Sequence, residues 1–378
     1  MKNIMSWIKK QFIPVFISAI FFIGLLELGS YGVLKYFKEA KINKAGMAFL
    51  NNQLIGFNDD GQLDTFNDVT TMIPNPYSLY WNNPEYQDEE YGKMYNSLGY
   101  RSNELESLGT ETIRILALGG STTNVYPFVK DNSKIWTYLV EEKLNISSNS
   151  TYHVMNAGLP YGTTAELLSH YIFKGKYTRP KYVIYHGGGN DRMPLFFPNY
   201  KTDYSHVRWS QAGAGMRNKV LKLVSYSNTL KLLTSVSFTH SPYNGSPPYK
   251  KLDANEVLQR VKNTKELAFR ENLEVLASET LRQESQLFLV GFLQAKKENL
   301  TRNDPLFIGF EDALMLGNER HDNIMKEIAE KYQHVHFLKL NADRFKEEWF
   351  LDNCHLTEEG EVEKAEQIAD FILKHLNE

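Results

Sequence analysis

Ile113-Arg-Ile-Leu-Ala-Leu-Gly-Gly-Ser-Thr-Thr123 is the segment from which the rest of the chain can be interpreted. Its apolar run from Ile113 to Leu118 has the length of a buried strand and leads directly into Gly119-Gly120-Ser121. A helix-like segment follows at about 133–144. A strand, a tight glycine turn and a helix present a side chain at the carboxyl edge of an α/β sheet, where such folds place their sites. Ser121 is therefore a candidate nucleophile. The alternative is a phosphate-binding or merely tight turn, although no Gly-Lys-Ser/Thr follows as in a P-loop.

Composition excludes several classes of protein. The chain has 378 residues and a formal net charge of −3, which argues against a general nucleic-acid binder. Its single cysteine, Cys354, excludes an internal disulfide framework and a cysteine-based zinc site. We predict no cofactor, no metal and no nucleic-acid partner.

The amino end has the character of a membrane span. Phe12 to Leu26 is apolar apart from a proline, a serine and a glycine, and the apolar character resumes after Glu27 as far as Leu34. These roughly 23 residues are enough to cross a bilayer. We predict an uncleaved transmembrane anchor at 12–34 after a cytoplasmic stub at 1–11. A cleaved signal peptide or a buried helix is the alternative, but the residues after Glu27 are not a small-x-small cleavage site. Lysines flank the span on both sides, so the positive-inside rule gives no orientation.

Residues 35–110 form a juxtamembrane extension that is rich in tyrosine and short of periodic segments. We predict an irregular segment packed on the main domain. A sugar-binding aromatic platform is the sharper alternative.

Strand-like and helix-like segments alternate from Ile113 to the end of the chain, which predicts a parallel sheet with helices on both faces. The expected later strands are 152–156, 182–186, 286–292 and 335–340, and the expected helices include 254–284 and 319–332. An insertion at about 192–250 interrupts the alternation, either as a lid or acyl-pocket wall or as a plain surface excursion. His334 and His336 fit an exposed strand edge better than a metal site, because no third ligand is apparent.

Four short motifs occur between Ile113 and the end of the chain, namely Gly119-Gly-Ser121-Thr122, Asn156-Ala-Gly158, Gly188-Gly-Asn190-Asp191 and Asp352-Asn-Cys-His355-Leu356. Together, and in this order, they resemble the motifs of the SGNH/GDSL hydrolases. Gly120 stands where the family usually has an aspartate. Upstream, Asn96-Ser-Leu-Gly-Tyr-Arg101 is similar to a segment that often precedes this domain in membrane-anchored bacterial members.

The resemblance implies a fold and a set of roles. The fold is a three-layer α/β/α, flavodoxin-like sheet of about five parallel strands over 111–378. Ser121 is the expected nucleophile, His355 its base, and Asp352 the carboxylate that orients the imidazole. The oxyanion hole is expected from the backbone N–H groups of Ser121 and Gly158 and from the side chain of Asn190. We interpret His186 and Asp191 as structural residues, and Cys354 as a passive neighbour.

These features predict a membrane-anchored serine esterase that acts on an ester-linked acyl group of a cell-envelope glycan or lipid. By family habit, its catalytic domain lies outside the cytoplasm. Two alternatives stay open. One is an O-acyltransferase that passes acetyl groups to a polysaccharide, and the other is a non-catalytic polymer-binding module.

Overall fold

The computed structural model describes residues 13–39, 71–208, 226–238, 252–265, 267–301 and 307–376. The predicted stub at 1–11 and residues 40–70 of the extension lie outside the described residues. The chain divides into two compact units. One comprises 1–68 and 208–249, and the other comprises 69–207 and 250–378.

A five-stranded parallel sheet forms the centre of the larger unit, as predicted. Its strands are β5 (Ile113–Gly119), β6 (Tyr152–Gly158), β7 (Tyr182–His186), β8 (Gln286–Val290) and β9 (Val335–Leu338). Their order is β6-β5-β7-β8-β9, and each neighbouring pair is parallel. The first strand therefore lies inside the sheet, and its carboxyl end is flanked by the ends of β6 and β7.

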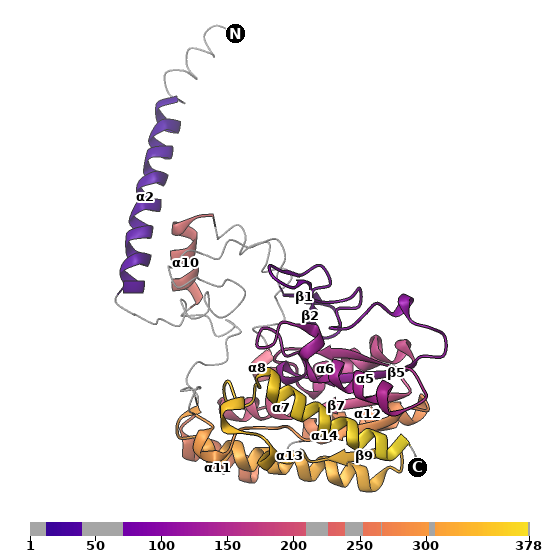
Figure 1. Ribbon diagram of the computed structural model, residues 1–378. Helices are drawn as coiled ribbons and strands as arrows, with labels where there is room; N and C mark the ends of the chain where they lie inside the picture. The colour runs from indigo at the N-terminus through magenta and orange to yellow at the C-terminus, as the bar shows by residue number, and fades with distance from the viewer. Residues whose placement is uncertain are drawn as a thin grey trace. The chain divides into compact units, whose positions relative to one another are not determined.

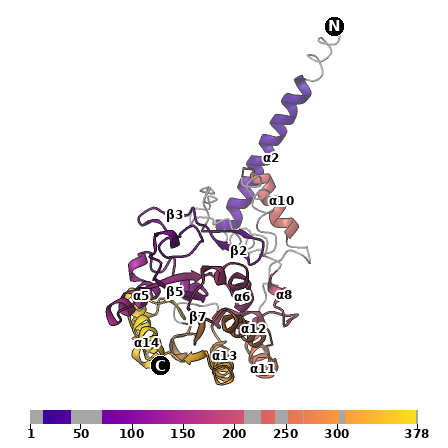
Figure 2. The ribbon, with the colours of Figure 1, turned by 90° about the vertical axis from the view of Figure 1, so that its right-hand side faces the viewer.

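Helices cover both faces of this sheet because successive strand residues point to opposite sides. In β5, Leu116 and Leu118 pack into the core beneath α6 (Thr164–Phe173), α12 (Leu267–Arg282) and α13 (Glu311–Lys331). Ile115 and Ala117 pack into the opposite core beneath α5 (Trp136–Ser147) and α14 (Glu358–Leu376). Figure 2 shows α5 and α14 on one side of the strands and α6 and α12 on the other. This is the three-layer arrangement that the resemblance implies.

Two expected helices differ in extent. The segment predicted as one helix at 254–284 is two helices, α11 (Ala254–Asn263) and α12, with Thr264 in an extended conformation after the first. The break arises because the two halves pack in different places. Val257 and Val261 of α11 join a core with Leu195 and Phe196, whereas α12 packs on the sheet. Helix α13 begins at Glu311, earlier than the predicted start at about 319.

Residues 71–110 of the tyrosine-rich extension belong to the same compact unit as the sheet, whereas residues 35–39 are the end of α2 in the other unit. Residues 71–110 form two short hairpins, β1 (Met72–Asn75) with β2 (Leu79–Asn82) and β3 (Gln87–Asp88) with β4 (Gly92–Lys93). The extension is tied to the loop after β6, where Tyr80 Oη donates to the Pro160 carbonyl at 2.8 Å. Asn82 Nδ2 likewise donates to the Gly158 carbonyl at 2.8 Å.

The smaller unit contains the amino-terminal helix α2 (Ile13–Glu39) and α10 (Asn228–Phe238). The segment Ile13–Tyr36 of α2 is long and apolar enough to cross a membrane, with a mean hydropathy of 2.0. Nearly all of its residues are exposed. Both helices are labelled in Figure 1. The predicted insertion therefore divides, since 192–207 stays in the larger unit and the excursion begins at about 208.

The two histidines near β9 have ordinary contacts. His334 Nε2 lies 2.9 Å from the Ala277 carbonyl oxygen. His336 stacks on Phe288 with ring centroids 5.3 Å apart. β9 is the edge strand of the sheet, which agrees with the prediction of a strand edge.

Candidate active site

The first loop holds Ser121 at the carboxyl end of β5. The strand ends at Gly119, and Ser121 begins a single helical turn, α4 (Ser121–Asn124). A side chain at either glycine would displace its neighbours. A Cβ on Gly119 would lie 2.1 Å from Thr123 Oγ1, and one on Gly120 would lie 2.6 Å from Asn190 Nδ2. The glycine pair therefore lets the third motif approach the nucleophile closely.

Ser121, His355 and Asp352 form a continuous hydrogen-bonded chain. His355 Nε2 lies 2.8 Å from Ser121 Oγ, and His355 Nδ1 lies 2.6 Å from Asp352 Oδ2. The histidine comes from a tight loop before α14, closed by a hydrogen bond of 2.8 Å from Leu351 N to the His355 carbonyl. Residues 234 positions apart in the sequence thus meet in the order that a nucleophile, a base and an orienting carboxylate require.

Asp352 is held as a carboxylate by its own loop. Its Oδ1 accepts hydrogen bonds of 2.8 Å from the backbone N–H groups of Cys354 and His355. Burial alone would raise the pKa of Asp352, but the hydrogen bonds from the His355 ring and from these two N–H groups outweigh it and lower the pKa below its usual range. An ionised Asp352 accepts a hydrogen bond from the Nδ1–H group of His355 and leaves Nε2 unprotonated, so that it can act as a base toward Ser121.

The expected oxyanion-hole donors differ in their availability. The Ser121 N–H lies in the first turn of α4, where helical hydrogen bonding does not use it. One N–H of the Asn190 amide donates to the Gly162 carbonyl at 2.9 Å, and a primary amide has a second. The Gly158 N–H instead donates to Asn156 Oδ1 at 3.0 Å. The glycine of this loop that contacts Asn190 is Gly162, four residues beyond the one that the motif indicated.

His186 and Asp191 have the structural roles predicted for them. Asp191 Oδ1 accepts hydrogen bonds from Thr164 Oγ1 at 2.6 Å and from Thr164 N at 3.1 Å, which ties the third motif to the start of α6. His186 Nδ1 lies 3.0 Å from Thr123 Oγ1, and burial holds the pKa of His186 well below its usual value. A neutral His186 beneath α4 fixes the turn that carries Ser121.

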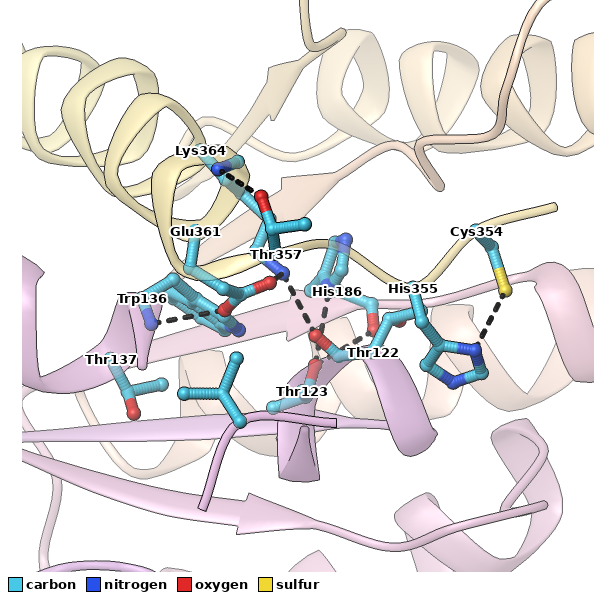
Figure 3. A network of polar contacts seen from close by, with 12 residues as sticks. Thr122, Thr123, Trp136, Thr137, His186, Cys354, His355, Thr357, Glu361 and Lys364 are labelled. Carbon is cyan, nitrogen blue, oxygen red and sulfur yellow. Dashed lines mark hydrogen bonds and ion pairs between the residues drawn. The ribbon is translucent and has the colours of Figure 1, made fainter. Parts of the chain in front are cut away.

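A buried ion pair on α14 contacts the turn that begins at Ser121. Lys364 Nζ lies 2.6 Å from Glu361 Oε1 and donates to the Thr122 carbonyl at 3.0 Å. Glu361 Oε2 in turn accepts from Trp136 N at 3.1 Å. Both charged side chains project from α14 (Figure 3). Helix α14, which follows His355, is therefore fastened to the turn that begins at Ser121.

Phe128 and Arg101 belong to the site although the sequence did not indicate their roles. The Phe128 ring stacks on His355, with centroids 3.7 Å apart and planes 14° apart. Arg101 is buried and donates to the carbonyls of Asn124 and Lys130, at 2.7 and 2.9 Å. Arg101 thus braces the loop that carries Phe128. Its position in the Asn96–Arg101 segment was a signal, but nothing local in the sequence identifies the loop that it binds.

The loop that carries Asp352 and His355 brings together atoms that could bind a metal ion. Among the described residues, Asp352, Cys354 and His355 place three such atoms within 4.8 Å of one another. The contact between His355 Nδ1 and Asp352 uses two of them as partners in a hydrogen bond. This arrangement favours a catalytic triad over a metal centre.

A cavity of about 290 Å³ lies apart from the triad. Its lining includes Arg101, Tyr138 and His153 but neither Ser121 nor His355. His153 is at the amino end of β6, whereas the catalytic loops follow the carboxyl ends of the strands.

No protein-family model matches the sequence, and no curated protein matches it. Among solved structures, an acetyl xylan esterase from Geobacillus stearothermophilus is 13% identical, with a TM-score of 0.42 over 69% of this chain and 94% of that one. A lipolytic protein of the G-D-S-L family from Desulfitobacterium hafniense is 13% identical, with a TM-score of 0.38 over 68% and 98% of the two chains. A GDSL-like lipase from Bacteroides thetaiotaomicron is 13% identical, with a TM-score of 0.37 over 69% and 88%.

Proposed function

We propose that this protein is a membrane-anchored serine esterase of the SGNH type, which hydrolyses an ester-linked acyl group through Ser121, His355 and Asp352. The observation that supports this proposal best is the hydrogen-bonded chain from Ser121 Oγ through the His355 ring to Asp352, with distances of 2.8 and 2.6 Å. A non-catalytic binding module would have no need of this alignment between two loops that are distant in sequence.

The reaction proceeds in two halves. His355 Nε2 takes the proton of Ser121 Oγ as the oxygen attacks the ester carbonyl, and the imidazolium that forms is stabilised by Asp352. The negative charge on the carbonyl oxygen is stabilised by the Ser121 N–H and the free amide N–H of Asn190. His355 then protonates the leaving alcohol, which leaves an acyl group on Ser121. Water attacks this acyl-enzyme with His355 as base, and the carboxylic acid departs.

The substrate is proposed to be an ester of the cell envelope, in a glycan or a lipid. The span at Ile13–Tyr36 supports attachment to a membrane, through the predicted anchor at 12–34. The tyrosine-rich extension packs on the loop after β6, which lies beside the site. The extension could therefore contribute a binding surface for such a substrate. We place the catalytic unit outside the cytoplasm. A reporter that is active only after export, fused after Glu378, is expected to be active, and a signal from a reporter that works only in the cytoplasm would reverse this orientation.

Labelling with a fluorophosphonate probe tests the chemistry. We expect the full-length protein to be labelled, and S121A to lose both the label and the hydrolysis of p-nitrophenyl esters. The matched control S150A changes an exposed serine on a surface turn and should be labelled like the natural protein. Labelling that survives S121A would remove the proposed nucleophile.

The acceptor is tested with the same ester. In the presence of an oligosaccharide, an esterase releases free acid at an unchanged rate. Acylated sugar that appears faster than free acid would identify the protein as an O-acyltransferase instead.

A further inference from the structure

The excursion from the catalytic unit contains a helix that packs on the amino-terminal span. Residues 208–249 belong to the same compact unit as α2. Their described helix is α10, with the sequence Asn228-Thr-Leu-Lys-Leu-Leu-Thr-Ser-Val-Ser-Phe238, in which Lys231 is the one charged residue. Figures 1 and 2 both show α10 alongside the C-terminal part of α2.

Glu27 of α2 closes the amino end of α10. Its carboxylate accepts hydrogen bonds from Asn228 N at 2.6 Å and from Thr229 N at 3.3 Å, and also from the hydroxyl of Ser227. Ser227 Oγ accepts in turn from Leu230 N at 3.1 Å. The first backbone N–H groups of α10 are thus satisfied within the protein. A helix in water can leave these groups to solvent, but a helix in hydrocarbon cannot.

The same contact explains a carboxylate inside an apolar span. Glu27 lies within the candidate span Ile13–Tyr36. Ionisable groups at such positions are costly unless they have partners. Here the partners are the Ser227 hydroxyl and the backbone N–H groups at the positive end of the α10 dipole. The carboxylate of α2 and the amino end of α10 are therefore complementary in charge and hydrogen bonding, although Glu27 and Asn228 are 201 residues apart in the sequence.

Apolar side chains of α10 remain exposed after this packing. Leu233 is 58% exposed and Leu230 is 38% exposed. Apolar side chains of α2 are exposed as well, including Ile20 and Leu28. Exposed apolar side chains on a helix that packs against a candidate membrane span fit the acyl chains of a bilayer.

We propose that α10 is a second membrane-embedded segment. It lies in the half of the bilayer next to the Tyr36 end of α2, its amino end is held by Glu27, and Leu230 and Leu233 face lipid. This inference rests on the proposed membrane anchor. The chain passes between the two compact units at three places, 68–69, 207–208 and 249–250. The larger unit, which carries Ser121, would therefore be joined to the membrane by three connections.

Single cysteines in the full-length protein test the proposal in phospholipid vesicles. Cys354 is the only cysteine, so C354S gives a background free of thiols. An environment-sensitive fluorophore is attached to L233C, to I20C in the span, or to E330C in the catalytic unit. We expect lipids that carry a quencher to quench residues 20 and 233, and aqueous iodide to quench residue 330.

The outcomes separate the two proposals. Quenching at 20 but not at 233, with residue 233 open to iodide, would overturn the embedded helix and keep the anchor. Residue 233 shielded from both quenchers would also overturn it, in favour of a protein partner. Residues 20 and 233 both open to iodide would overturn the anchor and the inference that rests on it.

Glu27 is tested in the L233C background. Loss of a capping carboxylate weakens a helix start by about fivefold in equilibrium terms. E27A is therefore expected to raise the fraction of residue 233 that iodide reaches by about that factor. S18A, at an exposed position of the same span, is the control and should change nothing. Unchanged shielding in E27A would show that Glu27 does not hold α10.

Discussion

Gly120 decides how closely two motifs of the site approach each other. A Cβ at this position would lie 2.6 Å from Asn190 Nδ2, whereas one at Gly109 would meet only Thr112 Oγ1 at 3.6 Å. G120A should therefore displace the Asn190 amide and lower turnover by about 10²–10³, the usual cost of one oxyanion donor. G109A is the matched control and should retain turnover. Ester hydrolysis by both variants is compared at saturating substrate, and full activity in G120A would remove Asn190 from the oxyanion hole.

The candidate catalytic and oxyanion-hole residues were partly predictable from the sequence. Ser121 was a candidate because an apolar run ends in two glycines, whereas Asp352 and His355 were indicated by the resemblance of their motif to that of the SGNH/GDSL hydrolases. Gly158 was chosen from its motif, yet its N–H is turned to Asn156 by the path of the chain. Phe128 carried no local signal, and the Asn96–Arg101 segment marked Arg101 without indicating its role, since stacking on His355 and bracing of a loop arise only in the folded chain.

Among the elements, α14 is fastened to the nucleophile's turn by a charge pair in the core. The side chains of Lys364 and Glu361 are 2% and 1% exposed. Removing one partner leaves a buried charge, so K364M should lower the free energy of unfolding by about 3 kcal/mol or more. The control is K134M, since the Lys134–Glu358 pair reaches the same helix but its side chains are 50% and 48% exposed. That variant should cost at most about 1 kcal/mol. Equal losses in denaturant unfolding would show that burial is not the cause.

The β3–β4 hairpin gives a second prediction, which concerns pH. The backbone N–H of Glu90 is the main cause that lowers the pKa of Asp88 to about 2 from 3.8, with help from Lys130 and Tyr126. A depressed pKa adds stability above the unfolded value, and this stability is lost as the pH falls through the folded value. The difference in unfolding free energy between the natural protein and D88N should therefore be constant above about pH 4 and shrink toward about pH 2. A difference that grows on acidification would contradict this linkage.

The strands were predictable as elements because each is an apolar run of strand length that ends at a turn signal. The helices were less so. The residues around Thr264 are polar and compatible with a continuous helix, and the break is set by the separate cores that α11 and α12 enter. The pairing of α2 with α10 could not be read from the sequence either, because no periodicity links segments so distant in the chain.

At the scale of the whole molecule, the catalytic apparatus lies within one compact unit. Residues 69–207 and 250–378 contain Ser121, Asn190, Asp352 and His355. The two ends of the excursion return to the same short helix, η5 (Met193–Phe196). His206 Nε2 lies 2.9 Å from the Pro194 carbonyl oxygen, and Leu252 N donates to the Phe196 carbonyl at 3.0 Å. A linker of about eight Gly/Ser residues spans roughly 16 Å, which suits two ends that meet at one helix.

A chain that begins at Val69 and carries this linker in place of 208–249 should therefore fold without the smaller unit, which contains α2 and α10. We expect it to stay in solution without detergent, because it lacks both α2 and α10. Its Ser121 should react with the fluorophosphonate probe within about tenfold of the natural rate, a barrier change of about 1.4 kcal/mol. Circular dichroism and thermal unfolding establish whether the shortened chain is folded. A folded chain whose Ser121 does not react would show that the membrane unit completes the active site, because every residue of the triad is still present.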